Sequence, residues 1–373
     1  MRSQLTAIKS LVVKIGTQTL SDPATKRLDV DYLHTVAAQV ARIVADRKIS
    51  VTIVSSGAVG AGMAELNLSK RPTDLPQLQA VAAVGQRRLM DAWAQAFAPH
   101  NTHVAQVLLT REDIDSRKRF LNLRNTIHAV HELGCVPIVN ENDTISTDEI
   151  VRISFGDNDI LAAHVSAALR ADLLVLLSNV DGVLDGNGQS IRTIEKTEEA
   201  LSLIRADKSQ LGKGGMSSKF AAAGMVTSGG EYLVVAHGRT PDVLHRILDG
   251  HEVGTIFLPR RSRSTGRARW IGAARAKGSV IIDDGAAAAV TTRNVSLLPA
   301  GVVDTTGDFD KGDVISIETR AGVVVAHGLS NYSANDLQRV RGMKTKDVRL
   351  TLAGHAYDEV VHRDNLVKRL ALD

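Results

Sequence analysis

The sequence predicts an α/β fold with a largely parallel sheet, followed by a smaller β-rich domain. In the first two-thirds of the chain, short β-branched runs alternate with longer amphipathic segments, as in parallel sheets with helices on both faces. The pattern changes after Leu258, where short runs separated by Gly, Asp and Asn replace this alternation. A chain of 373 residues is long enough for two domains.

Six apolar runs are the expected strands of the sheet, because they are short and rich in Val, Ile and Leu. They are Leu11–Val13, Val51–Val54, Val104–Leu109, Val136–Val139, Leu173–Leu177 and Tyr232–Val235. The expected helices carry apolar residues at helical spacing, several with Asp or Ser near the start. They are Asp31–Ala45, Leu75–Phe97, Arg124–Leu133, Asp159–Leu169 and Ser217–Ser228. Ligands bind beyond the carboxyl ends of such strands, so chemistry is expected in the loops that follow them.

The last third of the chain divides into a linker, a small domain and a tail. We assign residues 1–259 to the first domain and 260–277 to an exposed basic linker, which contains no acidic residue. Residues 278–356 are expected to form a small β-rich barrel, and 357–373 a C-terminal tail. The barrel's expected strands are Ser279–Ile282, Gly285–Val290, Val295–Leu298, Gly301–Val303, Asp313–Ile317 and Val323–Ala326.

The composition excludes several classes of protein. Hydrophobic residues make up 44% of the chain and charged residues 23%, a balance typical of globular rather than disordered proteins. One cysteine permits no internal disulfide, and no run of about 18 apolar residues is present, so we expect a soluble cytoplasmic protein. No His-Glu-x-x-His, paired Cys-x-x-Cys or G-x-S-x-G motif occurs, which removes the basis for a zinc hydrolase or an α/β-hydrolase.

Two strands end in small-residue turns suited to anions. Lys14 and Gly16 follow the first strand, where a glycine turn lets backbone amides approach phosphate and a lysine supplies positive charge. A tight turn with a surface lysine explains this segment equally well. The second strand runs into Ser55–Gly62, whose helix N-terminus favours a carboxylate or phosphate. Close packing without a ligand is the alternative for that turn.

Two acidic clusters are expected at the same end of the sheet. Asn140–Thr144 follows one strand, and Gly156–Asp159 opens the next helix. Their charges repel unless a substrate ammonium, a lysine or a magnesium ion lies between them. Ordinary turn and capping chemistry is the alternative.

A glycine-rich loop precedes the last helix of the first domain. Leu211–Lys219 combines glycine amides with a lysine on the first helical turn, an arrangement that suits a nucleoside triphosphate although it is not a Walker A motif. A mobile linker is the alternative.

Taken in order, these segments resemble the glutamate 5-kinases of the amino acid kinase superfamily. The motifs that carry the resemblance span nearly the whole chain: Val13–Gly16, Ser55–Ala58, Asn140–Asp143, Phe155–Asp159, Asn179–Gly182 and Gly212–Lys219. The resemblance implies a three-layer α/β/α sandwich, and residues 278–355, with Lys311–Val314, resemble a PUA domain. It also implies ATP-dependent phosphorylation of the γ-carboxylate of L-glutamate, the first step of proline synthesis.

The resemblance also implies roles for individual residues. Lys14 and Lys219 neutralise the transferred phosphoryl group, and Asp159 orients these lysines. Ser56, Asp143 and Asn158 correspond to glutamate-binding positions. ATP and Mg²⁺ are the implied cofactors, without a named protein ligand for the metal. The ATP-contacting positions are Lys14, Ser178, Asn179, Lys213, Gly214, Gly215, Met216, Ser217, Ser218 and Lys219.

Three residues depart from the usual pattern of this family. Lys213 replaces a small hydroxyl residue, Leu184 a tyrosine and Phe155 an aliphatic residue; the first two bear on nucleotide binding. The resemblance further implies a homo-oligomer that proline inhibits at a site overlapping that of glutamate. The lack of a long apolar run indicates no membrane partner, and no residue pattern supports RNA binding by the PUA-like domain. Two alternatives stay open: an amino acid kinase with another carboxylate acceptor, and an RNA-binding or regulatory PUA protein with an inactive kinase fold.

Overall fold

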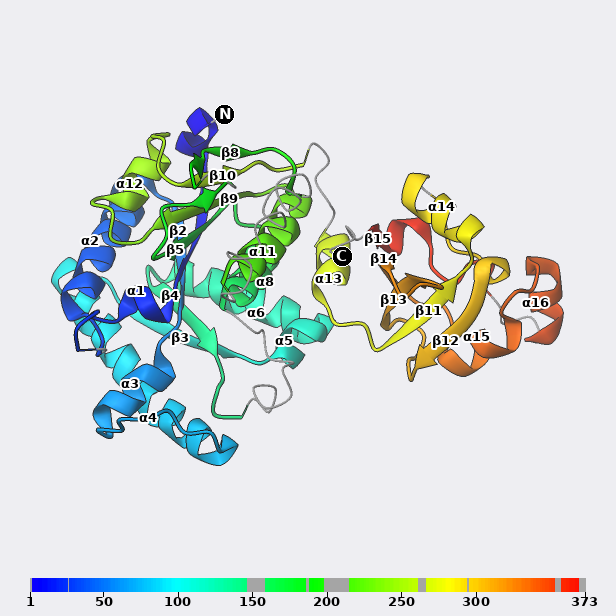
Figure 1. The fold of residues 1–373 in the computed structure, drawn as a ribbon, viewed down its shortest axis with the longest axis horizontal. Helices are drawn as coiled ribbons and strands as arrows, with labels where there is room; N and C mark the ends of the chain where they lie inside the picture. The colour runs from blue at the N-terminus through cyan, green and yellow to red at the C-terminus, as the bar shows by residue number, and fades with distance from the viewer. Residues whose placement is uncertain are drawn as a thin grey trace. The chain divides into compact units, whose positions relative to one another are not determined.

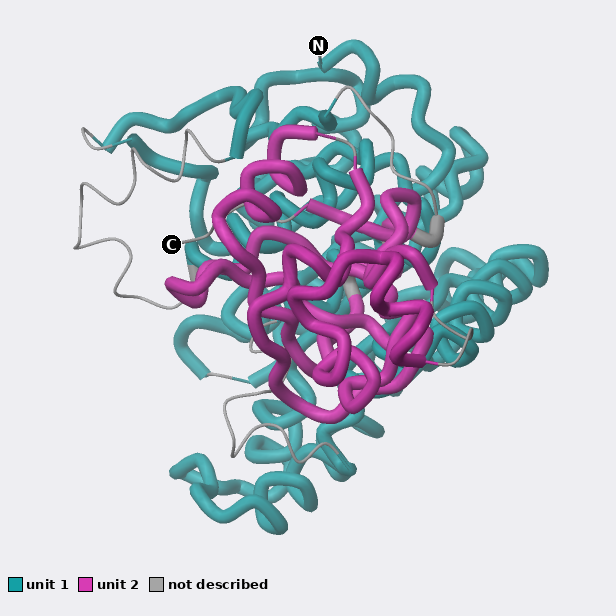
Figure 2. The backbone as a smooth tube through the Cα atoms, turned by 90° about the vertical axis from the view of Figure 1, so that its right-hand side faces the viewer, with its two compact units in different colours: residues 1–263 teal, residues 264–373 magenta. Residues whose placement is uncertain are grey.

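A computed structural model describes residues 2–25, 27–145, 158–185, 188–197, 215–260, 266–293, 295–352 and 357–368. These residues form two compact units, 1–263 and 264–373 (Figure 2). None of the helices within the described residues combines the length and the apolar character needed to cross a bilayer.

The first unit is built on an eight-stranded sheet with the order β3-β4-β2-β1-β5-β9-β10-β8 (Figure 1). Neighbouring strands are parallel from β3 to β9, and β10 runs antiparallel to β9. A separate two-stranded hairpin consists of β6 and β7. The strands are β1 Ser10–Ile15, β2 Ser50–Ser55, β3 Val104–Leu109, β4 Val136–Glu141, β5 Leu173–Ser178, β6 Val183–Leu184, β7 Ser190–Ile191, β8 Thr193–Ile194, β9 Tyr232–His237 and β10 Thr255–Phe257.

Helices cover both faces of this sheet, which makes the first unit a three-layer α/β/α sandwich. The helices α2, α4 and α12 lie on one face, and α6, α8 and α11 lie on the other. The helices are α1 Thr17–Leu20, α2 Val30–Arg47, α3 Ala58–Glu65, α4 Leu75–Phe97, α5 Arg111–Asp115, α6 Arg117–Glu132, α8 Asn158–Leu169, α11 Gly215–Gly229 and α12 Val243–Leu248, with 3₁₀ turns at Arg2–Ala7 and Ala98–His100. The predicted fold class and the six predicted strands are confirmed.

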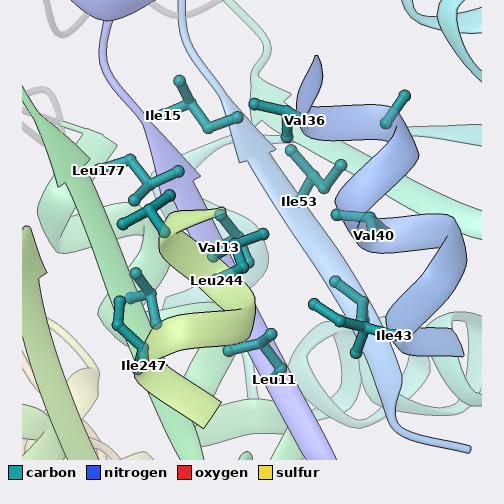
Figure 3. Packing of buried hydrophobic residues seen from close by; sticks show 14 of the residues in the cluster. Leu11, Val13, Ile15, Val36, Val40, Ile43, Ile53, Leu177, Leu244 and Ile247 are labelled. Atoms are coloured by element: carbon teal, nitrogen blue, oxygen red, sulfur yellow. The ribbon is translucent and has the colours of Figure 1, made fainter. Parts of the chain in front are cut away.

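Successive side chains of β1 point to opposite faces of the sheet, so the apolar core residues and Lys14 lie on different faces. Leu11, Val13 and Ile15 point toward α2 and α12 and are buried against them (Figure 3). Side chains of successive strand residues point to opposite faces, so Lys14 faces the layer that contains α8. A charged side chain can therefore lie beside a fully apolar core layer without entering it.

The second unit contains a five-stranded sheet with the order β12-β11-β13-β14-β15, in which only the β11–β13 pair is parallel. Its strands are β11 Gly278–Ile282, β12 Val302–Gly307, β13 Val314–Thr319, β14 Val324–Leu329 and β15 Leu366–Lys368. Its helices are α13 Gly266–Ala273, α14 Asp284–Thr292, α15 Ala334–Val340 and α16 Thr345–Thr351, with 3₁₀ turns at Pro299–Gly301 and Arg363–Asn365. The apolar faces of these elements form a core of their own.

Two predicted strands of the second unit are wrong, and the expected linker and tail both contain regular secondary structure. Gly285–Val290 lies in helix α14 rather than in a strand, because Asp283 caps the helix at Ala286 N and the alanines that follow favour helix over strand. Val295–Leu298 forms only an isolated bridge between Leu297 and Val361. The expected linker contains α13, whose Trp270 and Ile271 are buried, and the expected tail supplies β15, which pairs with β14.

Candidate active site

The candidate site lies at the carboxyl end of the central strands, where the chain leaves β1, β2, β4 and β5. Ser56 N donates to Ile15 O at 3.1 Å and Gly16 N to Leu177 O at 3.5 Å, so the turns after these strands are tied together. Gly57 follows Ser56 with a φ of 107°, a left-handed conformation that glycine adopts readily. This turn starts helix α3 directly beside the end of β1.

A charged trio consists of Lys14 on β1, Asp159 on α8 and Lys219 on α11. Lys14 Nζ lies 2.7 Å from Asp159 Oδ1, and Lys219 Nζ lies 3.0 Å from Asp159 Oδ2. Ser218 Oγ also donates to Asp159 Oδ2, at 3.4 Å. Asp159 has no exposed surface, and both lysines are buried. One carboxylate therefore holds two ammonium groups that start from different elements.

The electrostatics of the charged trio favour an anion. Two ammonium groups and one carboxylate leave one net positive charge in a region where burial weakens screening by water. Each lysine is also fixed in direction, because both carboxylate oxygens of Asp159 are used. The trio can thus receive and orient a phosphoryl group without first ordering flexible side chains.

A second group of side chains, here called the acceptor-side relay, consists of Gln86, Asn140, Asn158 and Ser56. Asn158 Nδ2 donates to Ser56 Oγ at 2.6 Å and to Asn140 Oδ1 at 3.1 Å. Asn140 Nδ2 donates in turn to Gln86 Oε1 at 2.9 Å. The relay carries no charge, and it connects the ends of β2 and β4 to α8 and α4.

Close contact between α3 and α4 explains why α4 reaches these strand ends. A Cβ added at Gly85 would lie 1.8 Å from Ala58 O, and one at Gly62 would lie 1.9 Å from Val81 O. Only glycine permits such an approach of the two backbones. As a result, Gln86 meets Asn140, and Trp93 Nε1 donates to Ser55 Oγ at 2.9 Å.

A pocket of about 1050 Å³ opens beside the ends of β1 and β5. Thr17 and Gln18 line it from the turn after β1, and Ser178 and Asn179 line it from the end of β5. Asn179 Nδ2 donates to Gln18 Oε1 at 2.9 Å, which links these two walls. The pocket is large enough for a drug-sized ligand.

The structure brings most of the predicted site residues to one end of the sheet. Asp143 lies in the turn two residues after β4, and Gly215, Met216, Ser217 and Ser218 lie in the first turn of α11, next to Lys219. The predicted residues Lys213 and Gly214, and the unusual Phe155, lie outside the described residues. Within the described part of the chain, no group of three His, Cys, Asp or Glu side chains could hold a metal ion.

Sequence reasoning did not single out Asn140 and Gln86 as site residues. Asn140 was visible only as part of a polar run after a strand. Gln86 follows Ala82 and precedes Leu89 on the buried face of α4, so the available signal was a polar residue at an apolar helical position.

Comparisons with known proteins cover almost the whole chain. Residues 9–237 match the model of the Amino acid kinase family, and residues 278–352 match that of the PUA domain. A glutamate 5-kinase of Myxococcus xanthus is 42% identical over 98% of this chain and 97% of its own length. A glutamate 5-kinase of Methanosarcina barkeri is 41% identical over 97% of each chain. The solved structure of Giardia carbamate kinase is 15% identical, with a TM-score of 0.49, over 68% of this chain and 100% of that one.

Proposed function

The chain belongs to the amino acid kinase family, and we propose that it transfers the γ-phosphoryl group of ATP to the side-chain carboxylate of L-glutamate. The observation that carries this proposal is the charged trio, in which Asp159 holds Lys14 and Lys219 at the carboxyl end of the sheet. The names of the full-length relatives support glutamate as the acceptor. The product is glutamyl 5-phosphate, which makes this the first step of proline synthesis.

The chemistry requires positioning rather than a general base. A carboxylate oxygen attacks the γ-phosphorus, a new O–P bond forms, and the bond to the bridging oxygen breaks, so that ADP leaves with the electron pair. The main obstacle is the approach of two anions. The ammonium groups of Lys14 and Lys219 offset this repulsion and stabilise the charge on the transferred group, while Asp159 fixes their directions.

The neutral acceptor-side relay and Asp143 suit the other end of glutamate. Ser56 and Asn158 are hydrogen-bonded to each other, so both are fixed before the ligand arrives. We assign a glutamate carboxylate to the Ser56 hydroxyl, and the α-ammonium to Asp143 and to Oδ1 of Asn158. Asp143 and Ser56 both follow the ends of strands in the same sheet, which supports this assignment.

We place the nucleotide along Ser178, Asn179 and the first turn of α11. Ser178 and Asn179 on the pocket wall, and Lys219 beside Asp159, fit the polyphosphate of ATP. Mg²⁺ would neutralise part of the phosphate charge, and because magnesium prefers oxygen ligands, the phosphate oxygens of the nucleotide would hold it without a named protein ligand. As the resemblance implies, we also assign Lys213 and Gly214, which lie outside the described residues, to ATP binding.

The resemblance extends the proposal beyond the reaction. We propose that the enzyme acts in the cytoplasm as a homo-oligomer, and that proline inhibits it at a site overlapping that of glutamate. Proline carries the same α-carboxylate and a secondary ammonium, so Asp143 and Asn158 suit both ligands.

Turnover with a panel of acceptors tests the proposed function. ADP release is measured with the purified chain and MgATP in the presence of L-glutamate, L-aspartate, N-acetyl-L-glutamate or no acceptor. We expect release that depends on L-glutamate and is lost in Lys219→Ala. ADP release that depends on another acceptor would change the proposed substrate but not the proposed mechanism. If no acceptor raises ADP release, the proposal is refuted.

A further inference from the structure

Gln86 on α4 is a buried polar side chain to which the mechanism assigns no role. Only 7% of its surface is exposed, and its Oε1 accepts the hydrogen bond from Asn140 Nδ2. Its Nε2 is buried without a hydrogen-bond partner among the described residues. A buried donor without a partner costs about 1–3 kcal/mol, so the Nε2 group lowers stability instead of adding to it. The position thus holds a polar group at a cost in stability.

In the structure, Gln86 is the acceptor at the end of the acceptor-side relay, and the direction of each further hydrogen bond is coupled to this arrangement. Because Oε1 of Gln86 accepts, Asn140 presents Nδ2 to it and therefore presents Oδ1 to Asn158. Asn158 must then donate through Nδ2, which it does to both Asn140 and Ser56. If the amide of Asn140 turned over, the same chain of contacts would run in the opposite direction.

This direction decides what the relay offers to a ligand. The oxygen of Ser56 accepts from Asn158, so its hydroxyl hydrogen is left to donate to a carboxylate. The Nδ2 group of Asn158 is used twice within the relay, so Oδ1 is left to accept from an ammonium. A reversed relay would turn a donor toward the ammonium and an acceptor toward the carboxylate, and both contacts would be unfavourable.

We propose that Gln86 is a positioning residue that sets the direction of the acceptor-side relay and thereby its preference for an amino acid. The inference deepens the proposed function and rests on it, since it takes an amino acid as the acceptor. Gln86 acts through Asn140. The tight glycine contacts between α3 and α4 keep it within hydrogen-bond distance of that residue.

Two substitutions at this position separate the hydrogen bond from the shape of the side chain. Gln86→Met keeps the length of the side chain and removes the acceptor, whereas Gln86→Glu keeps an acceptor oxygen toward Asn140. Gln95→Met, at an exposed position of the same helix, is the matched control. The full-length variants are compared by kcat, by KM for ATP, by KM for the acceptor that the wild type uses, and by thermal unfolding.

We expect Gln86→Met to raise the acceptor KM by about tenfold or more, with the ATP KM unchanged, because only the relay is altered. Gln86→Glu should restore the acceptor KM to within about threefold of the wild type, a result that a purely structural role of the side chain does not predict. Gln95→Met should resemble the wild type in all four measurements.

Three results would overturn the inference: an unchanged acceptor KM in Gln86→Met, equal effects of the Met and Glu variants, or a parallel rise of the ATP KM. If Gln86→Met does not fold, Gln86→Glu alone tests the inference. An acceptor KM of Gln86→Glu more than about tenfold above that of the wild type would then contradict the proposed direction. Failure of the wild type to use any acceptor refutes the proposed function, and this inference with it. Wild-type turnover with unaffected variants refutes this inference alone.

Discussion

The two halves of the site are built from different interactions. In the charged trio, one carboxylate forms ion pairs with two ammonium groups, whereas in the acceptor-side relay four uncharged side chains are joined by hydrogen bonds. The charged trio uses ion pairs of 2.7 and 3.0 Å, and the acceptor-side relay uses hydrogen bonds of 2.6, 3.1 and 2.9 Å. Charge that develops during phosphoryl transfer is best stabilised by fixed charges of the protein. A zwitterionic amino acid is best recognised by hydrogen-bond donors and acceptors of fixed direction. The difference predicts that damage to the trio lowers kcat and damage to the relay raises the acceptor KM.

The largest effect is expected for Asp159→Asn. The variant removes the negative charge that Asp159 places between two buried ammonium groups, so the two groups repel each other and their directions are less well fixed. We expect kcat to fall by about 1000-fold, with a smaller change in the glutamate KM. Steady-state kinetics measure both, and Asp46→Asn at an exposed position of α2 is the control. A change confined to the glutamate KM would remove the distinction between the two sides.

Asn158→Ala should produce the opposite pattern of kinetic effects. The substitution leaves Ser56 Oγ and Asn140 Oδ1 without their shared donor and removes a group assigned to the substrate. We expect the glutamate KM to rise by about 10- to 100-fold, with the ATP KM near that of the wild type. A fall of kcat at an unchanged glutamate KM would contradict the assignment of Asn158 to recognition.

Trp93→Phe tests how strongly α4 supports the relay from outside it. The variant removes the hydrogen bond from Trp93 Nε1 to Ser55 Oγ and leaves a small cavity in a fully buried position. We expect a loss of about 2 kcal/mol in the free energy of unfolding. The glutamate KM should rise less than about tenfold, because Ser56 keeps its own donor. Chemical denaturation and kinetics on one preparation check both values, and unaltered stability would refute the expectation.

A pH-dependent effect is expected at His131, which supports β2 at Thr52, three residues before the strand ends. Burial and, to a smaller extent, the nearby His128 together lower the pKa of His131 to about 4. Its Nε2 lies 3.0 Å from Thr52 Oγ1. The unfolded chain, with the ordinary pKa of 6.5, binds the proton first, so stability falls as the pH drops from 6.5 to 4.

His131→Gln should reduce this pH dependence by about one proton over the same range. Part of the slope should persist, because burial also lowers the pKa of His164, with Arg111 Nη1 at 2.9 Å adding to the effect. Unfolding free energies measured from pH 4 to 7 test the prediction, and identical slopes for the variant and the wild type would refute it.

The sequence predicts the first unit better than the second because its periodic patterns are long. Helix α4 is predicted at its observed bounds, since 23 residues of amphipathic pattern follow a capping Asp74. The segment Gly285–Val290 is short, and neighbouring strand signals led to a strand where an Asp cap and an alanine run form α14. Short segments lack the length over which helical and strand periods can be distinguished.

The site shows a similar limit. Lys14, Asp159 and Lys219 each follow or begin a predicted element, so the parallel fold alone brings them to one end of the sheet. Gln86 is a single polar residue inside a helix, and its link to Asn140 depends on the approach of α3 and α4 at Gly62 and Gly85. Sequence periodicity does not report such a tertiary contact.

Trapping the reaction product most directly tests the claim that this site phosphorylates the side-chain carboxylate of glutamate. The purified chain is incubated with MgATP, L-glutamate and hydroxylamine, and the hydroxamate is identified by mass spectrometry, with Lys219→Met as the matched control. The account predicts γ-glutamyl hydroxamate in amounts equal to the ADP released, and none in the variant. An α-hydroxamate, or ADP release without any hydroxamate, would contradict it.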